Sequence, residues 1–115
     1  MQITNKSLNT LAQILWAEYC EIFPALVKFD CPNIVLNARL RTTAGRCFLA
    51  ENKIDMAICF LTEKNKHTMI STILQHEMAQ EIDYNLFADE GHGPAWKMTM
   101  VKIGQDPKRC HNMEK

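Results

Sequence analysis

The chain has 115 residues, a length that supports one hydrophobic core but not two independent ones. Hydrophobic residues make up 47% of it and charged residues 23%, proportions typical of a folded globular domain, which excludes a largely disordered chain. The 13 basic and 13 acidic residues give a formal net charge of zero, so binding to nucleic acid or to an anionic membrane would need a local patch.

The sequence predicts a cytoplasmic protein without a membrane partner. The first ten residues lack a basic segment followed by an apolar run, and the longest apolar stretch, residues 56–61, is too short to span a bilayer. Five cysteines are an odd number without Cys-x-x-Cys spacing, which argues against a disulfide framework. We therefore expect reduced cysteines, and burial as small apolar residues for Cys20, Cys31, Cys47 and Cys59.

A first helix is expected over residues 5–22, because apolar residues recur there at spacings of three or four and Pro24 follows. The residues of this predicted apolar face are Leu8, Leu11, Leu15, Tyr19 and Ile22. Three short apolar runs, 33–40, 44–51 and 53–61, are separated by turn-like segments and predict a three-stranded antiparallel sheet.

Two further helices follow the predicted sheet. One is expected to begin after Thr62, a suitable N-cap, and to run to about residue 87. Pro94 suits the first turn of the last helix, and Gly104 suits its end. Together these elements predict an α+β fold with an amino-terminal helix, a small sheet, a central helix and a carboxy-terminal helix.

The central helix carries His76-Glu77-Met78-Ala79-Gln80, which differs at one residue from the zinc hydrolase motif His-Glu-x-x-His. In the intact motif, residues at i and i+4 share one helix face and can hold one metal, and the glutamate acts as general base. Catalytic zinc needs three protein ligands. His76 occupies the first ligand position, Gln80 the second, and His92 is a candidate third ligand after the glycine-marked loop.

Three segments, "ILQHEMAQ", "GHGPAWK" and "MVKIG", together resemble the SprT-like metallopeptidases, the family that includes the Spartan proteases. The resemblance is specific over residues 74–104 and covers most of the chain. It implies a zincin-like single domain over residues 1–115, a zinc cofactor held by His76 and His92, and Glu77 as the base that activates water. It also implies hydrolysis of peptide bonds in proteins associated with DNA.

Gln80 is the departure from the family pattern, and three interpretations of it stay open. It can be a tolerated weak ligand, a mark of a natural pseudoenzyme, or a deliberate substitution. An amide oxygen is neutral and hard, and it suits calcium or magnesium better than zinc, so zinc affinity is expected to fall. A carboxylate close in sequence could take the place of the missing imidazole, and the candidates are Glu81, Asp83, Asp89 and Glu90, although Glu81 is expected to point away from the helix face shared by positions 76 and 80.

The remaining candidates concern partners. Arg39, Arg41 and Arg46 surround a predicted turn and could form a weak DNA-contacting edge, or only a solvated sheet edge protected by charge.

Trp96 and Met100 are expected to pack in the core. The adjacent Cys110 and His111 lack a second cysteine pair, so no carboxy-terminal zinc ribbon is expected. The alternative to a peptidase is a non-catalytic module that binds protein or DNA.

Overall fold

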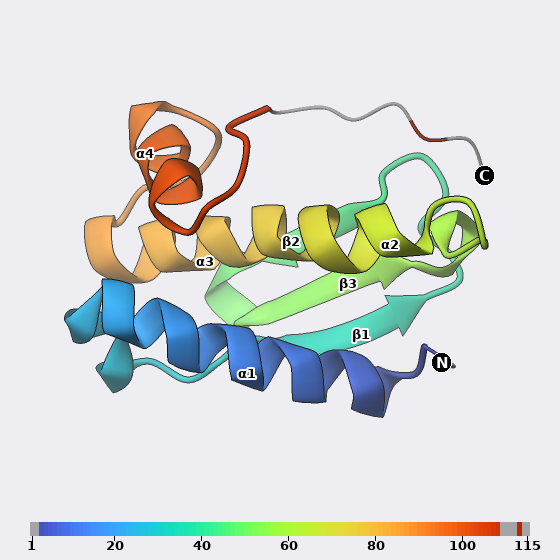
Figure 1. Ribbon diagram of the computed structural model, residues 1–115, viewed down its shortest axis with the longest axis horizontal. Coiled ribbons are helices and arrows are strands. Elements are labelled where there is room, and N and C mark those ends of the chain that lie inside the picture. The colour runs from blue at the N-terminus through green and yellow to red at the C-terminus, as the bar shows by residue number, and fades with distance from the viewer. Residues whose placement is uncertain (1–2, 109–112, 114–115) are drawn as a thin grey trace.

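The computed structural model describes residues 3–108 and Met113, and Figure 1 shows helices packed beside a small sheet. The order of helices and strands confirms the predicted α+β class. In chain order the elements are α1 (Asn5–Ile22), β1 (Asn33–Asn37), β2 (Gly45–Phe48), β3 (Lys53–Ala57), α2 (Lys66–Thr68), α3 (Leu74–Phe87) and α4 (Pro94–Lys102). Among the described helices, none combines the length and the apolar character needed to cross a membrane.

Helix α1 has the bounds that the sequence predicts. Thr4 and Ser7 form a reciprocal cap, in which the Ser7 N–H donates to the Thr4 hydroxyl (3.0 Å) and the Thr4 N–H donates to the Ser7 hydroxyl (2.8 Å). The predicted apolar face was wrong in part, because Ile22 is 42% exposed. The buried side chains are instead Leu8, Ala12, Trp16 and Tyr19. Small Ala12 allows close approach of the helix to the core, and the large Trp16 fills the space one turn later.

The sheet has the order β1-β3-β2, with β3 in the middle. Strands β2 and β3 are antiparallel, as predicted, but β1 pairs with β3 in parallel, so the prediction of a fully antiparallel sheet was wrong. Residues 38–44 therefore connect β1 to the far edge of the sheet and do not form a hairpin turn. The burial of β3 explains its central place, because Ile54 to Ala57 are all buried and such a strand needs neighbours on both sides. The parallel direction of β1 follows from the connection to the far edge, because β1 and β3 are not joined by a hairpin.

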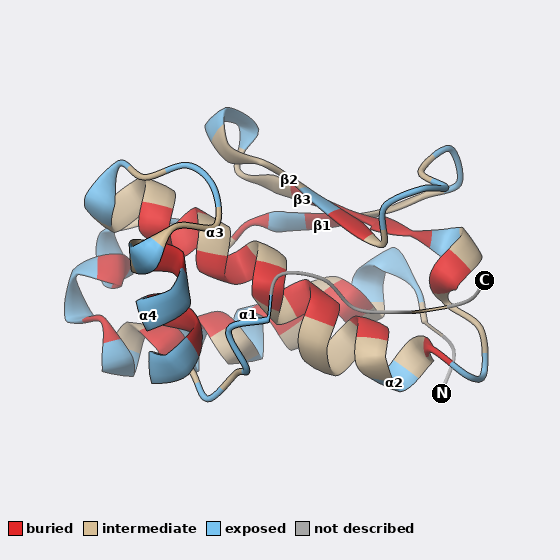
Figure 2. Ribbon diagram, turned by 90° about the horizontal axis from the view of Figure 1, so that it is seen from above, coloured by how far each residue is buried: buried red, intermediate tan, exposed pale blue. Residues whose placement is uncertain are grey.

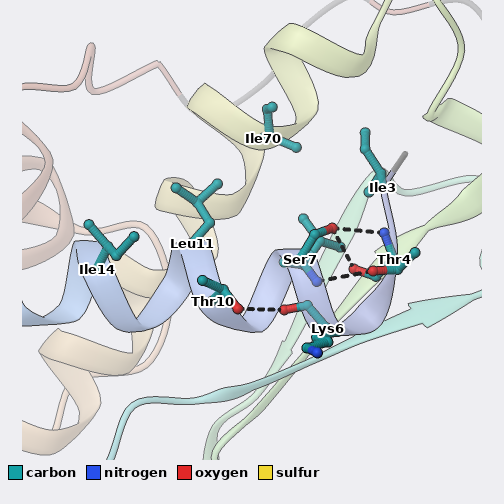
Figure 3. A pocket seen from close by; sticks show the side chains of 9 residues that line it. Ile3, Thr4, Lys6, Ser7, Thr10, Leu11, Ile14 and Ile70 are labelled. Atoms are coloured by element: carbon teal, nitrogen blue, oxygen red, sulfur yellow. Dashed lines mark hydrogen bonds between the residues drawn. The ribbon is translucent and has the colours of Figure 1, made fainter. Parts of the chain in front are cut away.

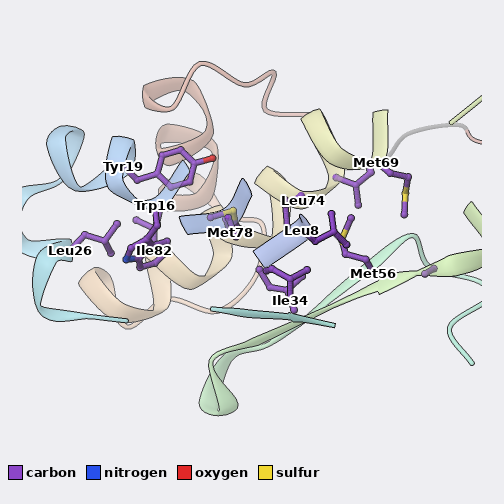
Figure 4. Close-up of a cluster of buried hydrophobic side chains, with 14 of the residues drawn as sticks. Leu8, Trp16, Tyr19, Leu26, Ile34, Met56, Met69, Leu74, Met78 and Ile82 are labelled. Carbon is purple, nitrogen blue, oxygen red and sulfur yellow. The ribbon is translucent and has the colours of Figure 1, made fainter. Parts of the chain in front are cut away.

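Helices α1 and α3 cover one face of the sheet, and Figure 2 shows buried residues gathered between these two layers. The core lies there. Figure 4 shows Ile34 and Met56 from the strands beside Leu74 and Met78 from α3, with Leu8 from α1 close to them. Residues of β2 alternate between the faces, so Gly45 and Cys47 lie toward α3 whereas Arg46 and Phe48 lie on the other face.

The segment that precedes α3 is not one continuous α-helix. Helix α2 is followed by a π-helical stretch, Met69–Ile73, and α3 begins only at Leu74. The predicted N-cap was also wrong, because the first helical residue is Lys66 and Asn65 occupies the cap position. Thr62 instead closes the preceding turn, where its hydroxyl accepts a hydrogen bond from the Asn65 N–H (3.2 Å).

The last helix agrees with its prediction. Pro94 is in the first turn of α4, and Gly104 follows the helix with a φ of 84°, a conformation that favours glycine. The four cysteines predicted to be reduced are free, but each of Cys20, Cys31, Cys47 and Cys59 is half-buried and not fully buried. Cys110 and His111 lie outside the described residues.

Candidate active site

His76 lies in the first turn of α3, and its side chain is buried with an exposed fraction of 4%. The indole N–H of Trp96, on α4, donates to the backbone carbonyl of His76 (3.3 Å). The ring centroids of these two residues are 5.3 Å apart in an edge-to-face arrangement. These two contacts hold the His76 residue of α3 against Trp96 of α4.

His92 lies in the loop between α3 and α4, and two backbone conformations turn this loop back toward α3. Ala88 ends α3 with a φ of 52°, and Gly91 has a φ of 123°, which a side chain would disfavour. The His92 ring contacts the Trp96 indole, which also contacts His76, and the ring centroids of His92 and Trp96 are 4.7 Å apart. The loop therefore returns His92 to the part of α3 that carries His76.

Gln80 lies on the same helix face as His76, one turn later. Its amide nitrogen Nε2 is 2.5 Å from the Nε2 ring nitrogen of His92, so the two side chains are hydrogen-bonded across the loop. The structure thus brings together the three residues that the motif singles out as ligand positions. Gln80 reaches His92 directly, and His76 and His92 share the Trp96 ring.

Glu77 lies where α3 crosses β2. A Cβ atom on Gly45 would stand only 3.2 Å from the Glu77 Cγ and 3.0 Å from the Ile73 Cγ2, so the absence of a side chain at Gly45 allows the helix to approach the strand. Burial raises the pKa of the Glu77 carboxyl to about 7, and a hydrogen bond from the Cys47 backbone acts in the opposite direction. A carboxyl with such a pKa can accept a proton near neutral pH.

Two of the four carboxylates proposed as replacement ligands have other contacts. Glu81 is fully buried and accepts a hydrogen bond from the Cys47 thiol (3.3 Å), and Asp83 accepts one from the Thr99 hydroxyl (2.5 Å). Within residues 3–108 and Met113, no group of three or more His, Cys, Asp or Glu side chains is arranged to hold a metal ion. A metal between His76 and His92 would therefore depend on Gln80 for a third protein ligand.

Three carboxyls with raised pKa values give the first prediction, which concerns stability without metal. Burial raises the pKa of Glu77 and of Glu81 to about 7 and that of Asp83 to about 6. The unfolded chain releases these protons near the ordinary values of 4.5 for Glu and 3.8 for Asp, so between pH 5 and pH 7 the folded state holds more protons. Stability should therefore fall as the pH rises, by about 2 kcal/mol or more between pH 5 and pH 8.

Urea unfolding of chelator-treated protein at pH 5, 6, 7 and 8 measures this fall. Glu81→Gln is the informative comparison, because Gln keeps an oxygen acceptor for Cys47 and removes one titrating group. The variant should show a shallower pH dependence. Stability that stays flat or rises from pH 5 to pH 8 would contradict the assignment of these carboxyls as protonated in the folded state.

The basic residues predicted from the sequence do not form one cluster with the motif. Arg39 and Arg41 are exposed in the segment that connects β1 to β2, and Arg46 is exposed on the sheet face opposite α3. There the Arg46 guanidinium lies 5.2 Å and the Lys53 ammonium 4.5 Å from the centroid of the Phe48 ring. This face therefore combines an aromatic ring with two cations.

The chain also forms an apolar groove of about 560 Å³ that contains none of the motif side chains. Ile3, Leu11 and Ile14 lie along it on the amino-terminal side, and Ile70 lies across it on the π-helical stretch (Figure 3). The polar residues of its lining are Thr4, Lys6, Ser7 and Thr10, and the three hydroxyls are engaged in hydrogen bonds at the start of α1. The motif therefore remains the candidate active site.

Sequence reasoning did not identify three residues that shape the site. Trp96 was expected only to fill the core, whereas its ring contacts both histidines. Gly45 and Cys47 were assigned to a strand without a role toward Glu77. The sequence carried no signal for these roles, since each depends on contacts between segments that lie far apart along the chain.

A family comparison agrees with this geometry. The sequence model that describes the SprT-like family matches residues 9–114, which include the motif helix, the His92 loop and α4. Neither the curated proteins nor the solved structures gave a match. The family indicates a metallopeptidase-like domain, in keeping with a histidine and glutamate pair on α3 and a second histidine that the following loop returns to it. The chain therefore belongs to the SprT-like family.

Proposed function

We propose that this domain is a zinc metallopeptidase with a weakened metal site, and that it hydrolyses peptide bonds in proteins associated with DNA. The observation that carries the proposal is the contact of Gln80 with the ring nitrogen of His92. This contact supports the proposal because it places the i+4 position of the motif helix beside the downstream histidine.

The donor set fits zinc in part. Catalytic zinc has three protein ligands and one open position. The two imidazoles are ligands that zinc favours, whereas the Gln80 amide oxygen is neutral and a weaker ligand. His76, His92 and Gln80 would hold the ion, and Gln80 would exchange its hydrogen bond with His92 for that role. When bound, zinc supplies Lewis acidity that lowers the pKa of water and polarises a peptide carbonyl.

Glu77 performs the proton transfers in this proposal. Its carboxylate takes a proton from the attacking water, the water oxygen bonds to the peptide carbonyl carbon, and the proton is then delivered to the amide nitrogen as the C–N bond breaks. Its pKa of about 7 suits both the acceptance and the return of a proton near neutral pH. Contact with β2, through Gly45 and the Cys47 backbone, holds the carboxylate beside the strand.

The edge position of β2 supports an extended peptide as substrate. In the order β1-β3-β2, strand β2 pairs only with β3 among the three strands of the sheet, so its outer edge can add a further strand. A substrate segment paired there would run past Gly45 and Cys47, the two residues that contact Glu77. Unfolded segments would be favoured, since a folded protein has few free extended segments.

Cleavage of an unstructured protein tests the proposed function. The unchanged chain with saturating zinc should cleave slowly, and the activity should disappear with chelator and in His92→Ala, which removes one of the two imidazoles. Addition of single-stranded DNA to the same reaction shows whether nucleic acid stimulates cleavage. If neither the unchanged chain nor Gln80→His cleaves at any zinc concentration, the domain is a non-catalytic binding module.

DNA association is expected to be weak and sensitive to salt, and strongest for single-stranded or distorted DNA, because the net charge is zero and only a local patch can bind phosphate. The combined change of Arg39, Arg41 and Arg46 to alanine should reduce the affinity for a single-stranded oligonucleotide about tenfold or more at low salt, measured by fluorescence anisotropy.

The control for this prediction changes Lys6, Lys28 and Lys97 to alanine, which removes the same charge from exposed positions on or beside α1 and α4. It should bind the oligonucleotide better than the arginine variant. Equal binding by the two variants would show that total charge alone matters, and binding by the arginine variant as tight as that of the unchanged chain would remove this patch from the proposal.

A further inference from the structure

Trp96 has more contacts with the candidate site than a core residue requires. It is fully buried, and its ring lies edge-to-face with His76 at 5.3 Å and with His92 at 4.7 Å between centroids. Its indole N–H is also the donor to the His76 carbonyl. One side chain on α4 therefore contacts both histidines, which come from different segments of the chain.

The surroundings of Trp96 separate it from the main core. It belongs to a small buried cluster with Ala79 and Met100, with Ile103 packed against it, whereas the sheet, α1 and most of α3 form a larger cluster. Ala79 lies three residues after His76, so a small side chain stands where the indole approaches α3. This small cluster joins α4 to α3 at the histidines.

We propose that Trp96 is a positioning residue, whose indole sets the side-chain orientations of His76 and His92 and so preforms their shared metal position. The inference rests on the proposed function, since it concerns the same two ligands. Two ring contacts restrict the rotation of both imidazoles, and the indole N–H fixes the backbone from which one of them projects. Groups that orient metal ligands typically change metal affinity by about 10- to 100-fold when they are removed.

Trp16 is a matched control. It is also buried, and its indole N–H also donates to a backbone carbonyl, that of Phe29 (3.1 Å), but it lies in the main core on α1. Trp96→Leu keeps apolar volume without the ring, Trp96→Phe keeps a ring without the N–H, and Trp16→Phe removes the corresponding N–H elsewhere. Each variant is compared with the unchanged chain by thermal unfolding, zinc titration and NMR. The NMR signals used are nuclear Overhauser effects between each histidine ring and its own backbone, which report the side-chain rotamer.

Trp96→Leu should weaken zinc binding by about tenfold or more and change the ring-to-backbone signals that report the side-chain rotamers of His76 and His92 in the metal-free protein. Trp96→Phe should fall between Trp96→Leu and the unchanged chain. Trp16→Phe should lower the unfolding temperature and leave the zinc affinity and the histidine signals unchanged. Positioning by Trp96 is overturned if Trp96→Phe, or a folded Trp96→Leu, keeps the original histidine signals and zinc affinity. If no protein in the set binds zinc, the proposed function fails, and the metal-free histidine signals still decide whether Trp96 positions the rings.

Discussion

Gln80→His should raise the zinc affinity of this domain by an order of magnitude or more and increase its peptidase activity. The helix already directs position 80 at His92, since the Gln80 amide nitrogen lies 2.5 Å from the His92 ring nitrogen. A histidine there would supply the third imidazole without a change of backbone. Loss of even the outer partners of metal ligands typically costs about 10- to 100-fold in affinity, so a direct ligand should matter at least as much.

Zinc dissociation constants and the rate of cleavage of an unstructured protein measure this effect. Gln13→His is the matched control, because it makes the same substitution at an exposed position of α1. It should leave both quantities unchanged. If the unchanged chain binds zinc as tightly as Gln80→His, the glutamine is an adequate ligand and the site is not weakened. A variant that binds zinc tightly and never cleaves would favour the binding module over the peptidase.

Glu77→Gln, introduced into the Gln80→His protein, should lower kcat by roughly 10²- to 10⁴-fold, the usual contribution of a general base. The amide has nearly the same shape but cannot accept a proton from water. Zinc binding should persist, because the proposed ligands are the side chains at positions 76, 80 and 92. Steady-state kinetics at saturating zinc, together with a zinc titration, separate these two effects.

Glu81→Gln is the control for this prediction. Glu81 is one turn later on α3 and is fully buried, but it contacts the Cys47 thiol, whereas Glu77 is hydrogen-bonded by the Cys47 backbone. Its loss should leave kcat within a few-fold of the parent. A similar fall in kcat for both variants would mean that a buried charge beside β2 matters in general, and the general-base role of Glu77 would not stand.

The sequence predicted α1 and α4 well because their signals are local. The Thr4 and Ser7 cap, Pro94 and Gly104 each act within one or two turns of the chain. The sheet was harder, because β1 pairs with β3, a strand that is not its neighbour in the sequence, so the turn-like residues after β1 do not reveal its partner or its direction. Short apolar runs cannot reveal which strand becomes central.

In the candidate site, too, local features could be predicted from the sequence, whereas contacts between distant segments could not. The common face of His76 and Gln80 follows from helical spacing alone, whereas the contact of Gln80 with His92 needs the loop geometry at Ala88 and Gly91. The role of Trp96 could not be read from the chain, since a tryptophan at helical spacing is more often a core residue than a partner of histidine rings. The approach of β2 to Glu77 depends on Gly45, a residue whose neighbours only the fold defines.

The most direct test of the weakened zinc site is an anomalous difference map at the zinc absorption edge, from crystals of the unchanged chain soaked in zinc. The account predicts a peak between the side chains of His76, His92 and Gln80, with the Gln80 amide turned from its hydrogen bond with His92 to present its oxygen. A map in which zinc binds elsewhere while the Gln80–His92 hydrogen bond is unchanged would contradict it.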